Sequence, residues 1–185
     1  MPTTRREATG SAVDAAEARQ GWAEAARPVL EGVAGTYNAT ISYAELADAV
    51  QASTGVVTTQ QMRHWIGPVL AFVTEDCLAR SEPVLSALCV KADGSVGAGY
   101  ASSIEKIRGT RPEDPEMDAA RERLACYQAY GATLPADGGR PTLNGIERER
   151  RERAALRASK VIPPRAACPE CHMQLLTSGI CGTCD

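Results

Sequence analysis

The amino-acid sequence predicts a mainly α-helical fold with one small β-hairpin and a C-terminal tail that needs a metal to fold. Apolar residues recur at helical spacing over most of the 185 residues, two β-rich segments flank an Asp-Gly pair, and four of the seven cysteines stand between positions 168 and 184. Aromatic residues make up only 4%, so the core must consist mostly of Ala, Val and Leu, which favours closely packed helices. The length suits one ordinary domain with a small appendage.

The N-terminal part is predicted to be a disordered lead followed by a long helix. Residues 1–12 show no apolar pattern, whereas residues 13–33 carry apolar side chains at near-helical spacing. Pro28 falls inside that pattern and is expected to kink or split the helix. Gly35 is expected to end it.

Two further helices are predicted in the next forty or so residues. Ser42 and Glu45 stand three positions apart, which is the pattern of a capping box at the start of a helix over residues 43–52. Gly55 breaks this helix, and a longer one is expected over residues 58–79. Two helices joined by a short glycine-containing break predict a helix-turn-helix unit.

A β-hairpin is predicted after the second of these helices. Residues 84–90 and 96–100 are rich in β-forming side chains and flank Asp93 and Gly94, a common hairpin turn. Two helices followed by a hairpin is a winged-helix-like layout. The glycines of this segment lack the strand-loop-helix setting and the Lys-Ser/Thr ending of a phosphate-binding loop, so we expect turn geometry there instead.

The remainder of the main domain, taken as residues 13–139, is predicted to end in a helix over 115–130 and a loop. A highly charged helix is expected over residues 143–159, within an Arg-rich helix and linker segment that covers 140–165. The net charge is −6 over residues 1–139 and +5 over residues 140–165. A charge asymmetry of this kind is the part of the composition that bears on the choice of partner.

The tail, residues 166–185, contains the run CPECHMQLLTSGICGTC, in which Cys168, Cys171, Cys181 and Cys184 form two CxxC pairs nine residues apart. Each CxxC turn aims two thiolates at one point, and two such turns make the tetrahedral sulfur cage that zinc prefers. Because all four positions are filled, the predicted Zn²⁺ site is structural and not catalytic. His172 is an alternative ligand, although its position directly after Cys171 favours a role at the surface.

The tail resembles one half of a double zinc ribbon. The resemblance implies a zinc-stabilised fold that serves nucleic-acid and protein contacts alike, and it implies no activity. The stretch ISYAELADAV together with PVLSALCVKADGSVGAGY resembles the winged-helix half of DNA alkyltransferase-like proteins. Those enzymes carry a reactive cysteine in a Pro-Cys-His-Arg sequence, whereas Cys89 stands between Leu88 and Val90, so alkyl transfer is not implied.

The same stretch, residues 41–100, also resembles small domains of actinobacterial and phage proteins, some of which look attached to nucleases. This resemblance supplies no catalytic residues. A winged helix would place its second helix in a major groove, and the residues expected to face the groove there include Gln60, Gln61 and Arg63. Against this, the block is not basic, and a structural or protein-binding role is the alternative.

The Arg-rich helix offers the stronger electrostatic case for DNA or RNA, through five side chains: Arg148, Arg150, Arg151, Arg153 and Arg157. A solvated helix laced by ion pairs and a protein-docking helix are the competing interpretations. The leading hypothesis is a non-enzymatic nucleic-acid-binding or regulatory protein. A protein adaptor or inhibitor, of phage or host, is the alternative, and a nuclease-associated accessory subunit is a third.

No catalytic residue is predicted. Of the two histidines, His64 has neighbours that give no nucleophile setting and His172 lies in the zinc tail, and the acidic residues show no recognisable nuclease or glycosidase spacing. A nuclease that gathers carboxylates from distant positions stays open. The sequence contains no apolar run of the roughly 18–20 residues that a membrane span requires, and the N-terminus has no secretory pattern. We therefore expect a cytoplasmic protein that does not enter a membrane.

Overall fold

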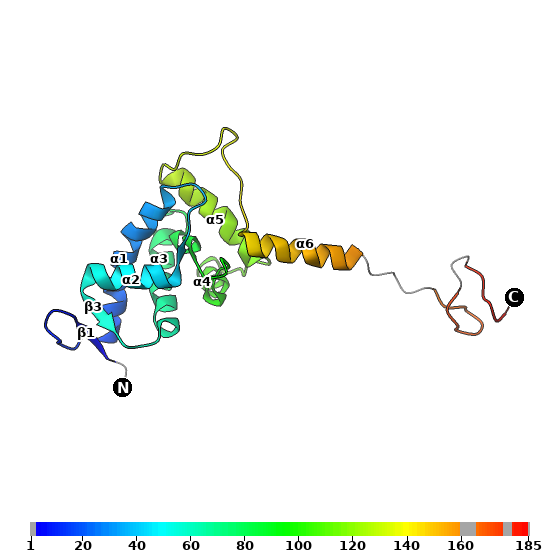
Figure 1. Cartoon of the computed structure of the whole chain (residues 1–185), viewed down its shortest axis with the longest axis horizontal. Coiled ribbons are helices and arrows are strands. Elements are labelled where there is room, and N and C mark those ends of the chain that lie inside the picture. The colour runs from blue at the N-terminus through cyan, green and yellow to red at the C-terminus, as the bar shows by residue number, and fades with distance from the viewer. Residues whose placement is uncertain (1–2, 160–165, 176–178, 185) are drawn as a thin grey trace. The chain divides into compact units, whose positions relative to one another are not determined.

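The computed structural model describes residues 3–159, 166–175 and 179–184 (Figure 1). They form two compact units, Met1–Arg148 and Glu149–Asp185. The linker expected over residues 160–165 lies outside the described residues. The elements are β1 (Thr4–Arg6), α1 (Ala15–Ala34), β2 (Ile41–Ser42), α2 (Tyr43–Thr54), β3 (Val56–Thr58), the 3₁₀ helix η1 (Met62–His64), α3 (Ile66–Ala79), the 3₁₀ helix η2 (Leu85–Leu88), β4 (Cys89–Val90), α4 (Ala98–Arg108), α5 (Pro115–Ala129) and α6 (Gly145–Ser159).

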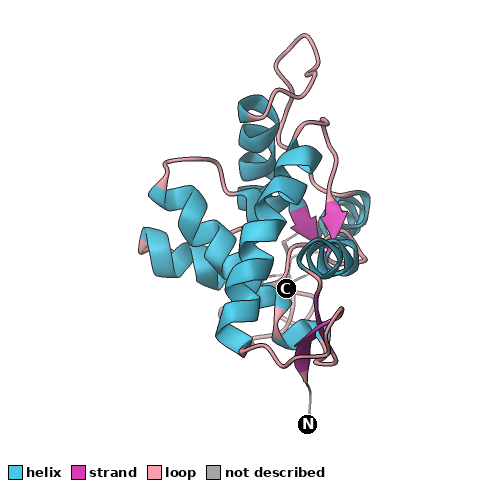
Figure 2. Cartoon of the chain, turned by 90° about the vertical axis from the view of Figure 1, so that its left-hand side faces the viewer, coloured by secondary structure: helices cyan, strands magenta, loops and turns pink. Residues whose placement is uncertain are grey.

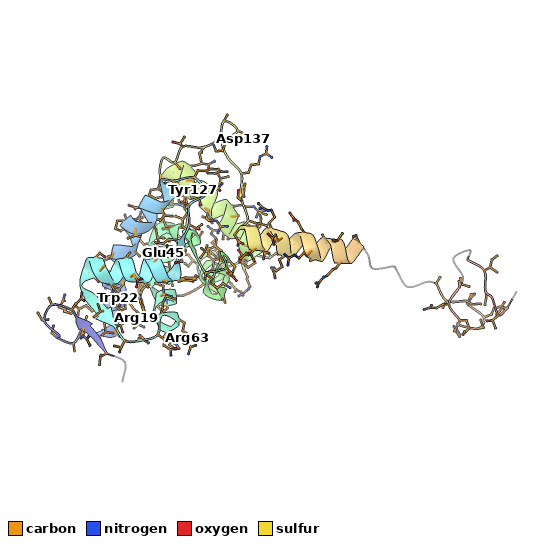
Figure 3. All side chains as sticks on the ribbon, in the orientation of Figure 1. Arg19, Trp22, Glu45, Arg63, Tyr127 and Asp137 are labelled. Atoms are coloured by element: carbon orange, nitrogen blue, oxygen red, sulfur yellow. The ribbon has the colours of Figure 1, made fainter. Side chains whose placement is uncertain are left out.

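Helix α1 confirms the first predicted helix and forms one wall of the main core. The Asp14 carboxylate caps it by accepting hydrogen bonds from the backbone N–H groups of Ala16 and Glu17 at 2.8 and 3.3 Å. The helix continues through Pro28 to Gly35, so the proline does not split it. Trp22 is buried in the core, where its ring centroid lies 4.4 Å from that of Trp65 and its Nε1–H donates to a backbone carbonyl at 3.0 Å (Figure 3).

The described residues of the expected disordered lead, 3–12, are instead part of the fold. Strand β1 pairs antiparallel with β3, and Thr4 lies opposite Thr58. This pairing joins segments more than fifty residues apart through backbone hydrogen bonds. The N-terminal side chains carry no apolar alternation, so the local sequence pattern gave no sign of the strand.

Helix α2 confirms the predicted capping box. The backbone N–H of Glu45 donates to Ser42 Oγ at 3.2 Å, and the backbone N–H of Ser42 donates to Glu45 Oε2 at 2.8 Å. Gly55 ends the helix in the left-handed conformation, with φ of 62°. Its buried side chains, Leu46, Ala47 and Val50, are the apolar positions of the predicted helix.

The predicted hairpin is wrong, and the winged-helix arrangement is not confirmed. Residues 85–88 form η2, and β4 pairs in parallel with β2 instead of with a following strand. The Asp93-Gly94 turn does form, because Lys91 N–H donates to the Ser95 carbonyl and Gly94 N–H donates to the Lys91 carbonyl, both at 2.8 Å. The chain then enters α4, whose buried Tyr100 and Ile104 follow helical spacing. Figure 2 shows how short the strands are beside the helices.

The second predicted helix of the helix-turn-helix unit begins later than expected. Helix α3 starts at Ile66, while residue 58 belongs to β3 and residues 62–64 form η1. Gln60, Gln61 and Arg63 therefore precede α3 and do not lie on it. The prediction that these three residues lie on a recognition helix is therefore wrong.

Helices α5 and α6 confirm the last two predicted helices. Arg123 of α5 is buried, and its guanidinium donates to the carbonyls of Ala87 at 3.2 Å and Thr142 at 3.3 Å, which ties η2 to the segment before α6. Asn144 caps α6 through its Oδ1, which accepts from Glu147 N–H at 2.8 Å, and its Nδ2 donates to the Gly94 carbonyl at 2.6 Å. Among the described residues, none of the helices is long and apolar enough to cross a membrane.

Candidate metal centre and basic helix

The first CxxC pair forms a tight turn held by backbone hydrogen bonds. His172 N–H donates to the Cys168 carbonyl at 2.9 Å, and Cys168 N–H donates to the Met173 carbonyl at 2.8 Å. An isolated antiparallel bridge between Ala167 and Gln174 closes the base of the turn. The second pair follows Gly179, whose φ of 79° is a conformation that glycine adopts at little cost.

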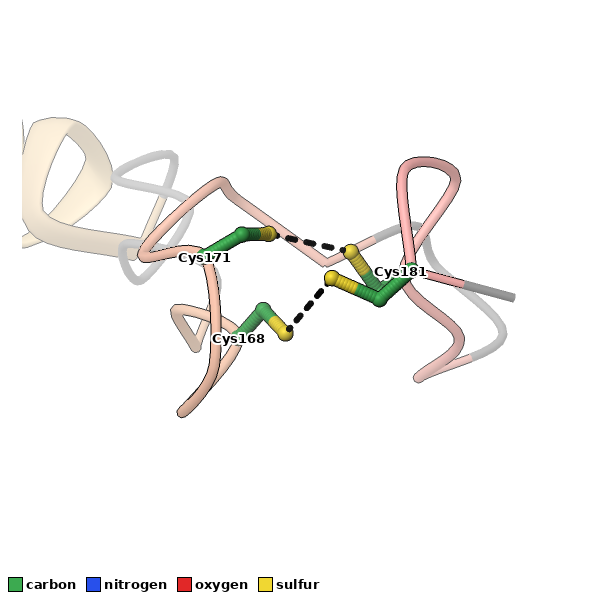
Figure 4. A group of neighbouring side chains, drawn as sticks. Cys168, Cys171 and Cys181 are labelled. Carbon is green, nitrogen blue, oxygen red and sulfur yellow. Dashed lines mark hydrogen bonds between the residues drawn. The ribbon is translucent and has the colours of Figure 1, made fainter.

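The two turns bring the four predicted cysteines together (Figure 4). All four Sγ atoms lie within 4.8 Å of one another. The Cys171 and Cys181 Sγ atoms are 3.4 Å apart, and those of Cys168 and Cys184 are 3.9 Å apart. A tetrahedral zinc with Zn–S bonds of about 2.3 Å sets sulfur–sulfur distances of about 3.8 Å. The observed distances lie on either side of that value, and all seven cysteines are free thiols, so the cluster fits a metal of this size.

The backbone around the cluster favours thiolates. Hydrogen bonds from the backbone N–H groups of Cys171 and Glu170 lower the pKa of the Cys168 thiol. The backbone N–H of Thr183, the neighbouring Cys171 thiol and the backbone N–H of Cys184 lower the pKa of the Cys181 thiol to about 6. Such N–H groups stabilise negative charge on sulfur, as the sulfur ligands of a cation require.

The same sulfur atoms oppose complete ionisation when no cation lies between them. For Cys171, a backbone hydrogen bond from Met173 lowers the pKa of the thiol, but the adjacent thiols of Cys184 and Cys181 outweigh it and raise that pKa to about 11. Four negative sulfur atoms at these distances repel one another, and a divalent cation removes the repulsion. The arrangement is thus chemically suited to a metal ion.

Burial within the tail is limited to part of the sulfur cluster. Cys168 and Cys181 are only 5% and 6% exposed, whereas the apolar side chains of Met173 and Ile180 are 58% and 51% exposed. The described part of the tail therefore gains little from apolar burial. His172 is exposed and is not among the clustered ligand groups, so the alternative in which it replaces a cysteine finds no support in the geometry.

The predicted Arg-rich helix is α6, and its periodicity divides the five candidate arginines. Arg150, Arg153 and Arg157 are three and four residues apart and share one side of the helix. Arg148 and Arg151 belong to another side. An ion pair of the type expected for a solvated helix joins Arg153 to Glu149 at 2.9 Å, with both side chains more than half exposed. An exposed pair of this kind adds less than about 1 kcal/mol, so it leaves the helix free to exchange partners.

The other predicted nucleic-acid residues lie in the Met1–Arg148 unit. Gln61 and Arg63 are exposed, and Arg63 Nε donates to the ring of His64 at 3.2 Å (Figure 3). Gln60 is held by its backbone N–H, which donates to Thr58 Oγ1 at 3.1 Å. These residues and the five arginines of the basic helix remain predictions as nucleic-acid contacts.

The Met1–Arg148 unit contains a cavity of about 440 Å³ that was not predicted from the sequence. Its lining comes from α2, η1, α3, η2, the segment around β4, and the start of α4, so no single stretch of sequence carries its pattern. Gly97 was the available signal, because a glycine there lets the Tyr43 hydroxyl approach the backbone closely.

Comparison of the chain with protein-family models, with curated proteins and with solved structures gave no match.

Proposed function

We propose that the tail binds one structural Zn²⁺ through Cys168, Cys171, Cys181 and Cys184. The observation that supports this most directly is the gathering of four Sγ atoms within 4.8 Å. Zinc would supply the folding free energy that the tail cannot obtain from apolar burial, about 10–16 kcal/mol for small zinc modules near neutral pH. A closed shell of four thiolates leaves no position for a substrate, so the role is structural.

The zinc content of the purified chain tests this part of the proposal. Native mass spectrometry should find one zinc per chain, and Cys181→Ala should lose it. Cys126→Ala is the matched control, because it also removes one cysteine but from the buried core. A chain that carries no zinc, or a Cys181→Ala variant that keeps zinc as tightly as Cys126→Ala, would contradict the proposed ligand set.

The protein is further proposed to be a non-enzymatic nucleic-acid-binding or regulatory protein that uses α6 for affinity. Two observations support this proposal: Arg150, Arg153 and Arg157 share one side of α6, and the segment 140–165 has a net charge of +5. Arginines with this spacing can follow a row of phosphates, and each phosphate contact releases counterions. The segment before α3, with Gln60, Gln61 and Arg63, is the proposed second contact, which would set register.

Fluorescence anisotropy with a labelled random duplex, at several salt concentrations, tests the nucleic-acid part. Substitution of Arg150, Arg153 and Arg157 by serine should weaken binding and reduce the slope of log affinity against log salt by about 3, roughly 1 per lost phosphate contact. The control variant replaces three arginines of the Met1–Arg148 unit by serine: Arg5, Arg19 and Arg121. It makes the same change in net charge and should leave the slope of log affinity against log salt nearly unchanged. Absence of binding at low salt would contradict the proposal.

A protein adaptor is the second candidate, and the exposed apolar side chains of the tail favour it. Met173 and Ile180 are both more than half exposed within the short metal-binding tail, which is the composition of a small protein-docking surface. An adaptor would bind one protein partner in a zinc-dependent manner and would be indifferent to DNA. Serine at both positions should then abolish partner binding while zinc content stays at one per chain.

A further inference from the structure

The cavity of about 440 Å³ lies beside the start of α4, in the unit that does not contain the metal tail. Its volume is in the range of small-molecule sites. Tyr43, Met62, Ile66, Leu70 and Tyr100 contribute apolar or aromatic surface to its walls. Flat apolar molecules pack favourably against tyrosine rings and methionine side chains, so the walls suit an aromatic body.

The lining of the cavity includes a hydrogen-bond acceptor. Thr74 Oγ1 donates to the Leu70 carbonyl at 2.8 Å, which uses its single hydrogen. The 2.6 Å hydrogen bond between Thr74 Oγ1 and Ser86 Oγ must then use the hydrogen of Ser86. Ser86 is 7% exposed and lines the cavity, so its oxygen can accept a hydrogen bond from a ligand but has no hydrogen left to donate.

The charged residues of the lining are positive. Arg63 and Lys91 are the charged residues among the lining residues, and the described lining contains no acidic side chain. The first turn of α4 adds to the positive potential, since its N-cap residue, Gly97, has no side chain with which to cap the N–H groups of that turn. Ala98 and Gly99, whose backbone N–H groups belong to this first turn, also line the cavity. An anionic group is the complement of these features.

We propose that this cavity binds a small aromatic molecule that carries an anionic group and, at another position, an N–H or O–H donor. The aromatic body would lie between Tyr43 and Tyr100. The donor would reach Ser86 Oγ, and the carboxylate or phosphate would meet Arg63, Lys91 and the start of α4. None of the four clustered cysteines and none of the five candidate arginines of α6 is among the described lining residues, and the proposal does not rest on nucleic-acid binding.

An NMR titration of the zinc-loaded full chain tests the proposal with four probes. Indole-3-acetate has the aromatic body, the N–H donor and the anion; indole-3-acetamide lacks the charge; benzothiophene-3-acetate lacks the donor. Indole-3-acetate should shift the amide signals of Gly97 and Gly99, and each of the two altered probes should bind about five-fold more weakly, the effect of one hydrogen bond or charge contact. Adenosine 5′-monophosphate tests whether a phosphate supplies the anionic group. If it shifts the amide signals of Gly97 and Gly99 and binds more tightly than indole-3-acetate, this result would also support the site.

Two variants distinguish the cavity from non-specific binding. A Cβ added at Gly99 meets no atom within 4 Å, so Gly99→Leu should fold. Because Gly99 lines the cavity, its leucine side chain should block the binding of every probe. Gly32→Leu on α1, where a Cβ also meets no atom within 4 Å, is the matched control and should leave probe binding unchanged. In Arg63→Gln/Lys91→Gln the preference for indole-3-acetate over indole-3-acetamide should disappear. Any of three results would overturn the proposal. The amide shifts could persist in Gly99→Leu, or the preference for indole-3-acetate over indole-3-acetamide could survive the loss of both Arg63 and Lys91. The third is that no probe shifts the cavity amides at about 1 mM.

Discussion

Gly97→Ala should destabilise the Met1–Arg148 unit because the site has no room for a methyl group. A Cβ built at Gly97 lies 2.2 Å from Tyr43 Oη, whereas real Cβ contacts essentially never fall below 3.0 Å. The two groups must therefore separate by about 0.8 Å, and overpacking of this kind costs about 1–3 kcal/mol. The backbone is not the cause, since Gly97 has φ of −70° and ψ of 153°, which any residue adopts. Urea denaturation followed by circular dichroism measures the loss in the free energy of unfolding.

Tyr43→Phe provides a sharp test of this explanation. Without the hydroxyl, the nearest atom to the new Cβ is Tyr43 Cζ at 3.1 Å, a tight but tolerable contact. Gly97→Ala should then cost about 1–2 kcal/mol less in the Tyr43→Phe background than in the wild type. Gly99→Ala, two residues along α4 and in open space, should instead be neutral or stabilise by up to about 1 kcal/mol. Equal costs in both Tyr43 backgrounds would refute the reasoning.

Three further predictions concern α5, α6 and the metal tail. Burial raises the pKa of Glu116, and the buried Oε2 of this residue has no hydrogen-bond partner among the described residues. Because the folded pKa lies above the unfolded pKa, the stability that Glu116 contributes is complete below the unfolded pKa and is lost as the pH rises through the folded pKa. Glu116→Gln keeps an acceptor for Val96 N–H and should raise the Tm more near pH 7 than near pH 4; an equal rise at both would contradict this. Asn144→Ala should cost about 1 kcal/mol in urea denaturation through loss of the α6 cap, whereas Thr142→Ala, which removes only an exposed hydrogen bond to the Arg140 carbonyl, should cost less. His172 has φ of 59°, so His172→Gly should tighten zinc binding about three-fold in chelator competition, whereas His172→Ala, which keeps the Cβ, should not.

The elements that sequence reasoning predicted well are those whose hydrogen bonds and apolar contacts are local. The capping box of Ser42 and Glu45 spans three residues, and its geometry follows from those two side chains. The long apolar periodicity of α1 likewise reports one buried face. The four clustered cysteines belong to the same class, because each CxxC pair shapes its own turn and the two turns are separated by only nine residues.

The errors occurred where distant segments decide the structure. Residues 96–100 are too few to distinguish a strand from the start of a helix, and α4 becomes evident only when Tyr100 is paired with Ile104 against the second apolar cluster. Helix α3 does not begin at residue 58, as the sequence predicted, because residues 56–58 pair with β1 and cannot enter the helix. A residue bound in a ladder with a distant strand is unavailable to the local helix, whatever its own pattern favours.

The sequence by itself determined the helical class, the capping box of Ser42 and Glu45, the basic segment and the four-sulfur centre, because each rests on interactions between residues close together in the chain. Only the tertiary structure decided the β1–β3 pairing, the parallel β2–β4 contact and the cavity beside α4. The cavity shows the reason most clearly, since Tyr43, Ser86 and Gly97 come from three separate elements and acquire a shared surface only when those elements pack. Local pattern specifies which faces are apolar, whereas packing specifies which of those faces meet and what space they leave between them.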